Sequence, residues 1–151
     1  MEIALVPPTS AEKVFINVQN NEGDELLPGE VVEWDQTTTD ADQGFGVQVV
    51  VAAINATTGI GAQVAGVVDS TITTGETGRL QVYGPDLVRA SASLDVSRMV
   101  VAGSINATNK GHVTTSIQTT TTAAQYHGAI VGWTLENGPN ATNSTVQLTI
   151  L

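Results

Sequence analysis

The sequence lacks cysteine and has few charged or aromatic residues. Without cysteine, the 151-residue chain has no disulfide framework, no thiolate nucleophile and no cysteine-ligated zinc site. Charged residues make up 13% of the chain and aromatic residues 4%. No apolar run approaches the roughly 20 residues that span a bilayer, and residues 1–30 lack the basic and apolar regions of a signal peptide. We therefore expect a protein made in a cytoplasm, with no membrane partner.

Basic residues are scarce, and the acidic residues are concentrated near the amino terminus. The formal net charge is −10, from 5 Lys and Arg against 15 Asp and Glu. Residues 1–44 hold most of the acids with Lys13 as their only base, whereas residues 45–151 are nearly neutral. This balance argues against direct binding of nucleic acid, which needs a Lys and Arg surface. The sparse charge of residues 45–151 indicates either a surface that faces other protein or a neutral, wet surface coated with Thr and Ser.

Threonine, valine and glycine dominate what is present, with 21, 20 and 15 residues. β-Branched side chains favour strands, and no segment shows a sustained helical period. Alternation and turn residues predict about ten strands, at the spacing of a compact all-β sandwich or barrel of jelly-roll or β-tulip type. The expected strands are residues 13–19, 30–34, 45–54, 63–73, 79–83, 88–94, 99–105, 112–118, 128–135 and 145–151.

Local signals add detail to this prediction. Residues 63–73 and 79–83 form an expected hairpin whose turn glycines, Gly75 and Gly78, supply positive φ. Gly84 and Pro85 are expected to end the second of these strands. Residues 1–13, which contain Pro7 and Pro8, read as an extended arm that is either disordered or laid on a neighbour. Residues 14–151 form the single predicted β domain.

The residues needed for catalysis or metal binding are not grouped in a known pattern. Ser70 has no Gly-x-Ser-x-Gly elbow, and His112 and His127 stand in different segments. Asp35, Asp40 and Asp42 lie in a polar stretch without the spacing of a calcium loop. We expect a solvated acidic loop there, and we predict no catalytic, cofactor or metal site.

One enzyme family shares a short motif with this chain. Trimeric dUTPases are all-β chains with a Gly-Val-Ile-Asp motif followed by a tyrosine, and residues 66–69 match its opening. Ile72 stands where that family has the tyrosine that bounds the substrate sugar. A dUTPase-like hydrolase is therefore the least favoured of the functions considered.

Three stretches carry a wider resemblance. They are residues 66–85 with the return strand Gln-Val-Tyr-Gly, residues 27–32 with a Pro-Gly strand entry, and residues 132–138 together with 146–151. In this order, on a Thr, Val and Gly background, the chain resembles the small head-decoration (cement) proteins of tailed bacteriophages. The resemblance implies a compact β domain that binds the outer surface of the phage head as a homotrimer. Such a protein stabilises the capsid by bridging subunits of the major capsid protein.

Candidate protein contacts follow from this hypothesis. They are the arm prolines Pro7 and Pro8, the aromatic residues Trp34 and Tyr83, and the cations Arg79 and Arg89. We expect the arginines to pair with acids on a partner or to be solvated. Trp133 is expected to be buried in the domain core. The alternative function is a β-sandwich module that binds carbohydrate or a host surface, although such modules usually display several exposed aromatic residues.

Overall fold

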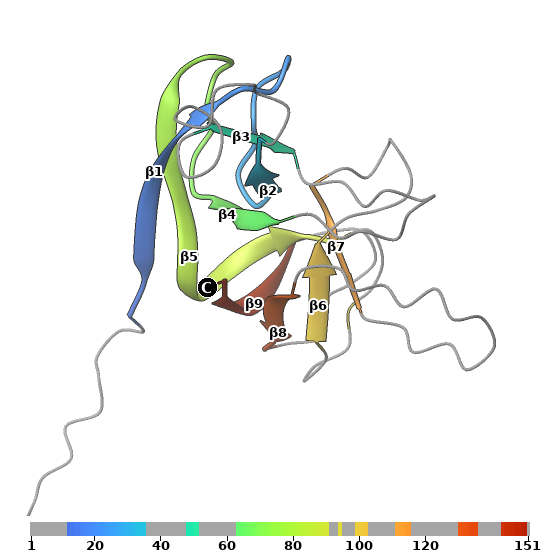
Figure 1. Cartoon of the computed structure of the whole chain (residues 1–151). Coiled ribbons are helices and arrows are strands. Elements are labelled where there is room, and N and C mark those ends of the chain that lie inside the picture. Colours follow the sequence, from blue (N-terminus) through green and yellow to red (C-terminus); the bar gives the residue numbers. More distant parts are fainter. Residues whose placement is uncertain are drawn as a thin grey trace, which may run out of the picture.

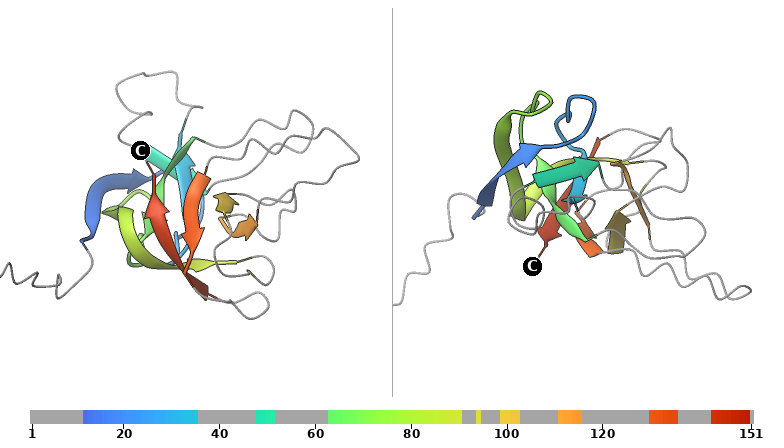
Figure 2. Two further views of the ribbon diagram at one scale, coloured as in Figure 1. Left: turned by 90° about the horizontal axis from the view of Figure 1, so that it is seen from below. Right: turned by 45° about the horizontal axis from the view of Figure 1, so that its top comes forward.

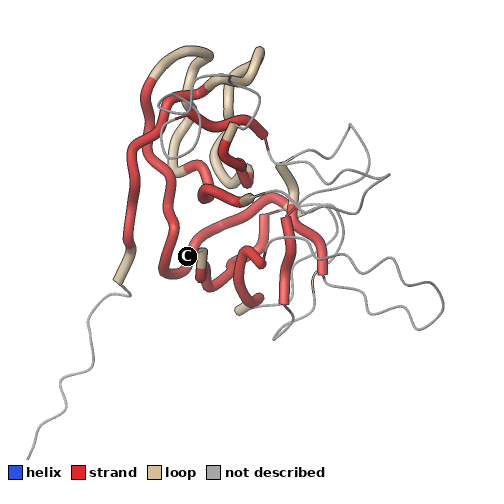
Figure 3. The backbone as a smooth tube through the Cα atoms, viewed as in Figure 1, coloured by secondary structure: helices blue, strands red, loops and turns tan. Residues whose placement is uncertain are grey.

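The computed structural model describes residues 12–35, 48–51, 63–90, 94, 99–102, 111–115, 130–135 and 143–150. Within these residues all regular structure is strand, as the composition predicts (Figure 3). The strands are β1 (Val14–Asn20), β2 (Val31–Trp34), β3 (Gln48–Val51), β4 (Val64–Val68), β5 (Thr77–Arg89), β6 (Met99–Ala102), β7 (Val113–Thr115), β8 (Ile130–Thr134) and β9 (Asn143–Thr149). No helix in this part of the chain has the length and apolarity to cross a lipid bilayer.

Five strands close into a barrel. Of the two architectures that the sequence left open, sandwich and barrel, the structure shows the barrel. The strand order runs β1-β3-β2-β4-β5, and β5 returns to pair with β1 (Figure 1). The β1–β5 pairing is antiparallel from Val14 opposite Tyr83 to Gln19 opposite Thr77. A parallel contact between β1 and β3 completes the ring.

The second half of β5 belongs to another sheet, ordered β5-β9-β8-β6-β7 (Figure 2). β5 pairs with β9 from Tyr83 to Arg89, along the whole length of β9. This sheet also curls, because Ala90, directly after β5, bridges Val113 at the start of β7. The molecule therefore has a barrel and a curled second sheet that share one long strand.

Two hydrophobic clusters fill these two parts, and adjacent valines supply both. Val32 and Val68 point into the barrel cluster, whereas their neighbours Val31 and Val67 point into the second cluster. All four are almost completely buried. The wall formed by β2 and β4 is thus covered on both faces, which is why its sequence runs Val-Val rather than alternating.

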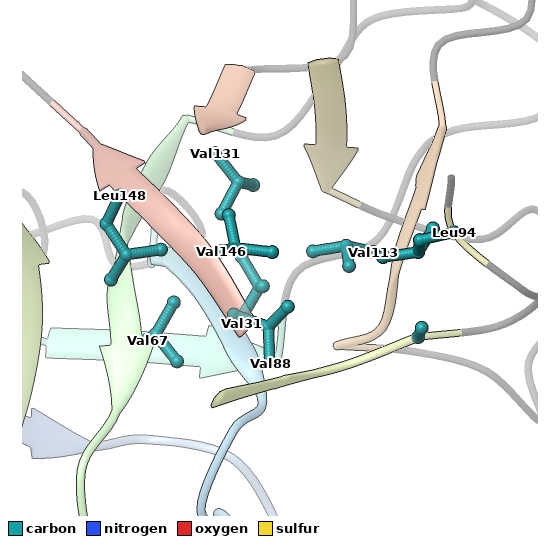
Figure 4. Close-up of a cluster of buried hydrophobic side chains, with 9 residues drawn as sticks. Val31, Val67, Val88, Leu94, Val113, Val131, Val146 and Leu148 are labelled. Atoms are coloured by element: carbon teal, nitrogen blue, oxygen red, sulfur yellow. The ribbon is translucent and has the colours of Figure 1, made fainter. Parts of the chain in front are cut away.

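The second cluster joins that wall to the curled sheet. Its members come from β2, β4, β5, β7, β8 and β9 and from Ala90 and Leu94, which follow β5 (Figure 4). They are Val31, Val67, Val88, Ala90, Leu94, Val113, Val131, Val146 and Leu148. Full burial of a valine or leucine side chain contributes roughly 1.5–3 kcal/mol, so this cluster is a main reason that the two parts stay together.

Gly84 and Pro85 do not end a strand, contrary to the sequence prediction. β5 runs through both residues, and the expected strands 79–83 and 88–94 are largely one strand. Beyond Tyr83, β9 is the sole described strand paired with β5, so Pro85 needs no donor on the other edge. The carbonyl oxygens of Tyr83 and Pro85 accept hydrogen bonds from the Gln81 side-chain amide, at 3.2 and 3.1 Å.

The β4–β5 hairpin is confirmed, with a different role for one glycine. Gly75 has a φ of 79°, as the turn requires. Gly78 lies inside β5 and is needed for space, because a Cβ there would approach Ile72 to 2.4 Å. The expected strand 63–73 ends at Val68, and Ile72 forms an isolated bridge with Leu26 instead.

The other predicted strands are found, most of them shorter than expected. β3 lies inside the expected segment 45–54, and β6, β7 and β8 lie inside theirs. His112 and Leu135 are described and lie just outside β7 and β8, and the other flanks of these segments fall outside the described residues. So do residues 1–11, which make up almost all of the predicted arm, including Pro7 and Pro8. Glu12 and Lys13 are described, exposed and not in a strand.

Candidate interaction surface

Five large hydrophobic side chains are exposed on the described part of the molecule, and the strand register places them on one face. They are Val14, Tyr83, Leu87, Trp133 and Leu135, with exposed fractions between 41% and 52%. We call this set the apolar face. It runs from the start of β1 across β5 and β9 to the end of β8.

Cross-strand pairing shows why these residues share a face. Directly opposed residues on neighbouring strands point to the same side of a sheet. Tyr83 of β5 lies between Val14 of β1 and Thr149 of β9. Leu87 is opposite Thr145, whose carbonyl oxygen accepts a hydrogen bond from the amide of Leu135 at 3.0 Å.

These pairings form two rows across the sheet, Val14–Tyr83–Thr149 and Leu87–Thr145–Leu135. A third row of the same face contains Trp133. This residue pairs with Gln147 of β9, and Gln147 pairs with Pro85 of β5. The residues between the rows, Val146 and Leu148, are fully buried on the opposite side of the sheet. The apolar face is therefore the outer face of the sheet whose inner face builds the second core cluster.

The expectation that Trp133 is buried is wrong, because a β-bulge changes the alternation of β8. Val100 pairs with Gly132 and Val101 with Ile130, so Val131 is an extra residue in β8. Val131 turns into the core with no exposed surface, and Trp133, two residues later, points outward with 49% of its surface exposed. A regular strand would place both side chains on the same side.

The exposed hydrophobic residues of β5 follow the regular alternation of the strand, in which Leu80 and Val88 are buried and Tyr83 and Leu87 point outward. Leu80 is buried in the barrel cluster, whereas Tyr83 and Leu87, farther along the strand, are exposed. The pairing with β1 skips one residue of β5 between Gln81 and Tyr83. The irregularity lies next to Tyr83, where β5 leaves its pairing with β1 and begins its pairing with β9.

The apolar face carries no ionisable side chain apart from the tyrosine hydroxyl, and charges lie at its border. Lys13 approaches Asp86 with its Nζ 3.9 Å from Oδ1. The pKa of Asp86 is raised, chiefly because burial removes water from its carboxylate, and the amide of Leu87 and the charge of Lys13 partly offset this. The second carboxylate oxygen of Asp86 is buried without a hydrogen-bond partner.

The predicted contact residue Arg79 pairs with an acid of its own chain. Its Nη2 lies 2.6 Å from Oδ2 of Asp69, and its guanidinium lies 4.7 Å from the ring centre of Phe15. More than half of the side chain is exposed. Exposed ion pairs contribute little to folding, so Arg79 is also available to solvent or to a partner.

Arg89 lies at another position, between β2 and β5. Its Nη1 is 3.1 Å from Oε1 of Glu30, and its Nε donates to the carbonyl oxygen of Pro28 at 3.2 Å. His112 faces this pair, and its pKa is lowered first by burial and then by the charge of Arg89, with Glu30 acting in the opposite direction. Arg89 thus joins the Pro28–Gly29 turn to β5.

The remaining candidates are separated from one another. Trp34 is half-buried and packs against the barrel cluster, whereas Tyr83 belongs to the apolar face.

Asp35 is not in a solvated loop as expected: it is 1% exposed and accepts a hydrogen bond from the Asn21 side-chain amide. Asp40, Asp42 and His127 lie outside the described residues. Among the residues that are described, no group of His, Asp or Glu has the arrangement of a metal site.

Sequence reasoning identified Tyr83 but not the rest of the apolar face. The signal is weak, because in Val-Gly-Trp-Thr-Leu both alternating sets contain residues typical of strands. Thr134 is the buried residue, and its apolar neighbours Trp133 and Leu135 are the exposed ones. Only the pairing with β9 shows which set faces outward.

Comparisons with known proteins found similarity in structure but not in sequence. No protein-family model matches the chain, and no curated protein matches it. Its fold is similar to the crystal structure of the head fiber gp8.5 N base of bacteriophage phi29, with a TM-score of 0.56 and 12% identity. The match covers 91% of this chain and 94% of the phage chain. At this level of identity the likeness establishes a shared fold.

Proposed function

We propose that this protein is a structural component of a tailed-bacteriophage head, attached to the outer surface of the shell as a homotrimer. In this role it stabilises the capsid by bridging subunits of the major capsid protein. It is made in the host cytoplasm, acts on the exterior of the virion and has no catalytic role or cofactor.

The observation that carries this proposal is the likeness to the head fiber N base over nearly the whole of both chains. The sequence also resembles head-decoration proteins, and this resemblance supports attachment to a phage head without using the fold. Sparse charge in residues 45–151 and an exposed apolar face are what a protein packed against other protein needs. A repeating lattice also makes weak individual contacts sufficient, because attachment is multivalent.

Virion composition and head stability test this proposal. Mass spectrometry of purified virions is expected to find the chain at high copy number. Heads made without it are expected to release DNA at a lower temperature, and purified protein added back is expected to restore the difference. Absence from virions, or heads whose stability does not change, would contradict the proposal.

The predicted arm can be tested in the same assay. A variant without residues 1–11 is expected to bind heads more weakly than the full chain, because an extended segment can reach a neighbouring subunit. A second variant replaces the predicted contact residues Pro7 and Pro8 with alanine and keeps the length, which separates their contribution from that of the rest of the arm. Equal binding by all three proteins would remove the arm from the contact.

A second candidate function is carbohydrate or host-surface binding. The observation in its favour is that Trp133 and Tyr83 are both about half exposed and lie on one face. Aromatic rings with a polar atom suit a sugar, which offers both apolar and hydroxyl surfaces. Saturable binding on a glycan array, lost in Trp133→Ala and kept in Trp34→Phe, would favour this function over head attachment.

A further inference from the structure

We propose that the apolar face packs against a second copy of this chain. In a closed trimer the face then borders the three-fold axis, where the same residues of the three copies meet. This inference rests on the proposed function for the number of copies, but its argument comes from the surface itself.

The first argument is the apolar area left uncovered. Five side chains with exposed fractions of 41% to 52% leave on the order of 400 Å² of apolar surface, about the largest patch that a typical monomer shows. A stable interface buries about 800 Å² per partner. Half-buried Pro85, Thr145, Gln147 and Thr149, which fill the same three rows, supply further area of the kind found around an interface centre.

The second argument is charge. Each copy carries a formal charge of −10, so two copies repel wherever their acidic surfaces meet. Self-association therefore requires a contact region without carboxylates. The apolar face meets this requirement, since its five residues and the strand partners between them are uncharged.

The third argument is rigidity. Four of the five exposed side chains lie on the sheet formed by β5, β9 and β8, whose other side is the second core cluster. Such a platform loses little conformational freedom on binding, which lowers the cost of association. Trp133 pairs with Gln147 on one side and with Met99 on the other, so its backbone is fixed by two neighbouring strands.

The test compares two glutamate substitutions by sedimentation velocity. Leu135→Glu places a charge in the apolar face, and Asn17→Glu places the same charge on an exposed position of β1. Wild type and Asn17→Glu are expected to sediment as the same oligomer, and Leu135→Glu as a monomer with at least a tenfold weaker self-association. Circular dichroism and a urea titration check that both variants fold. An oligomer that survives Leu135→Glu, or a monomeric wild type, would overturn the inference.

Fluorescence provides a second measurement that does not alter the face. In Trp34→Phe, Trp133 is the remaining tryptophan, and its emission is expected to move to longer wavelength as the protein is diluted and the face becomes wet. Emission that does not change with concentration would contradict the inference. If that emission is blue-shifted and deleting residues 1–11 moves it to longer wavelength, the chain's own first residues cover the face instead.

Head binding is scored separately, so that the two proposals can fail independently. An oligomer of the expected kind that does not bind heads contradicts the proposed function alone. A monomeric wild type that binds and stabilises heads contradicts the interface and the trimer, and leaves head attachment standing.

Discussion

At the scale of single residues, the backbone conformation of Gly84 and the atoms around it explain why this position is a glycine. Gly84 has a φ of 97°, and a Cβ there would lie 2.2 Å from the carbonyl oxygen of Glu12. The chain entering β1 therefore crosses β5 where no side chain is present. Gly23, in contrast, has no atom within 4 Å of an added Cβ.

We predict that Gly84→Ala destabilises the protein by about 1–3 kcal/mol, since it combines a strained φ with a backbone clash. Gly23→Ala is the control and is expected to be neutral or slightly stabilising, within about 1 kcal/mol, because alanine restricts the unfolded chain more than glycine does. Urea titrations of both variants measure the two free energies of unfolding. Equal stability of the two variants would contradict the prediction, because it would show that the backbone at Glu12 can move away from a side chain at position 84.

His112 makes the stability depend on pH in a direction that follows from its environment. Burial and the charge of Arg89 lower its pKa in the folded protein below the usual value of 6.5. The unfolded chain therefore takes up the proton first as the pH falls, and folding stability decreases from about pH 6.5 down to the folded pKa. We predict that His112→Gln reduces this loss, with unfolding measured at pH 7.5 and at pH 5. An unchanged difference between the two pH values would show that His112 does not contribute.

At the scale of elements, β2 and β4 are unusual in having both faces buried. Val31 and Val32 are successive residues of one strand, yet each lies in a different core cluster with no exposed surface. In a sheet with one wet face, one of the two would point to water and tolerate a polar residue.

We predict that Val31→Thr and Val32→Thr each destabilise the protein by about 1–3 kcal/mol, because each buries a hydroxyl in an apolar cluster. Threonine keeps the β-branched shape, so the difference reports polarity rather than volume. Val14→Thr, on a side chain that is 41% exposed in the single chain, is the control and is expected to change stability by less than about 0.5 kcal/mol when all three are made in the Leu135→Glu background, where the apolar face is uncovered. Urea titration measures all three. A strand that tolerated threonine at either buried position would have a face open to water.

At the scale of the whole molecule, charge and apolar surface are separated. The acids are concentrated in residues 1–44, while four of the five exposed hydrophobic side chains come from residues 83–135. Self-association through the apolar face then brings together copies that repel one another over long range. Salt screens such repulsion, with a Debye length of about 10 Å at 0.1 M.

We predict that raising the salt from 50 to 300 mM NaCl, the two concentrations of the experiment, strengthens self-association by roughly two- to tenfold. The added salt screens the repulsion between the acidic copies, and the proposed interface contains no ion pair that the salt would weaken. Sedimentation equilibrium at the two concentrations measures the change. Weaker association at high salt would indicate that contacts between Arg79 or Arg89 and acids of a partner hold the copies together.

The sequence by itself determined the fold class and most strand positions. β-Branched residues and glycine-rich turns are local signals, and they suffice to predict an all-β chain and the β4–β5 hairpin. Tertiary structure decided what depends on partners distant in the chain. Closure into a barrel requires β1 to meet β5, and the continuation of β5 through Gly84 and Pro85 depends on β9. The outward position of Trp133 follows from the pairing of β8 with β9, and a bulge against β6 lets Val131 face the core as well, because alternation alone leaves the choice of face open.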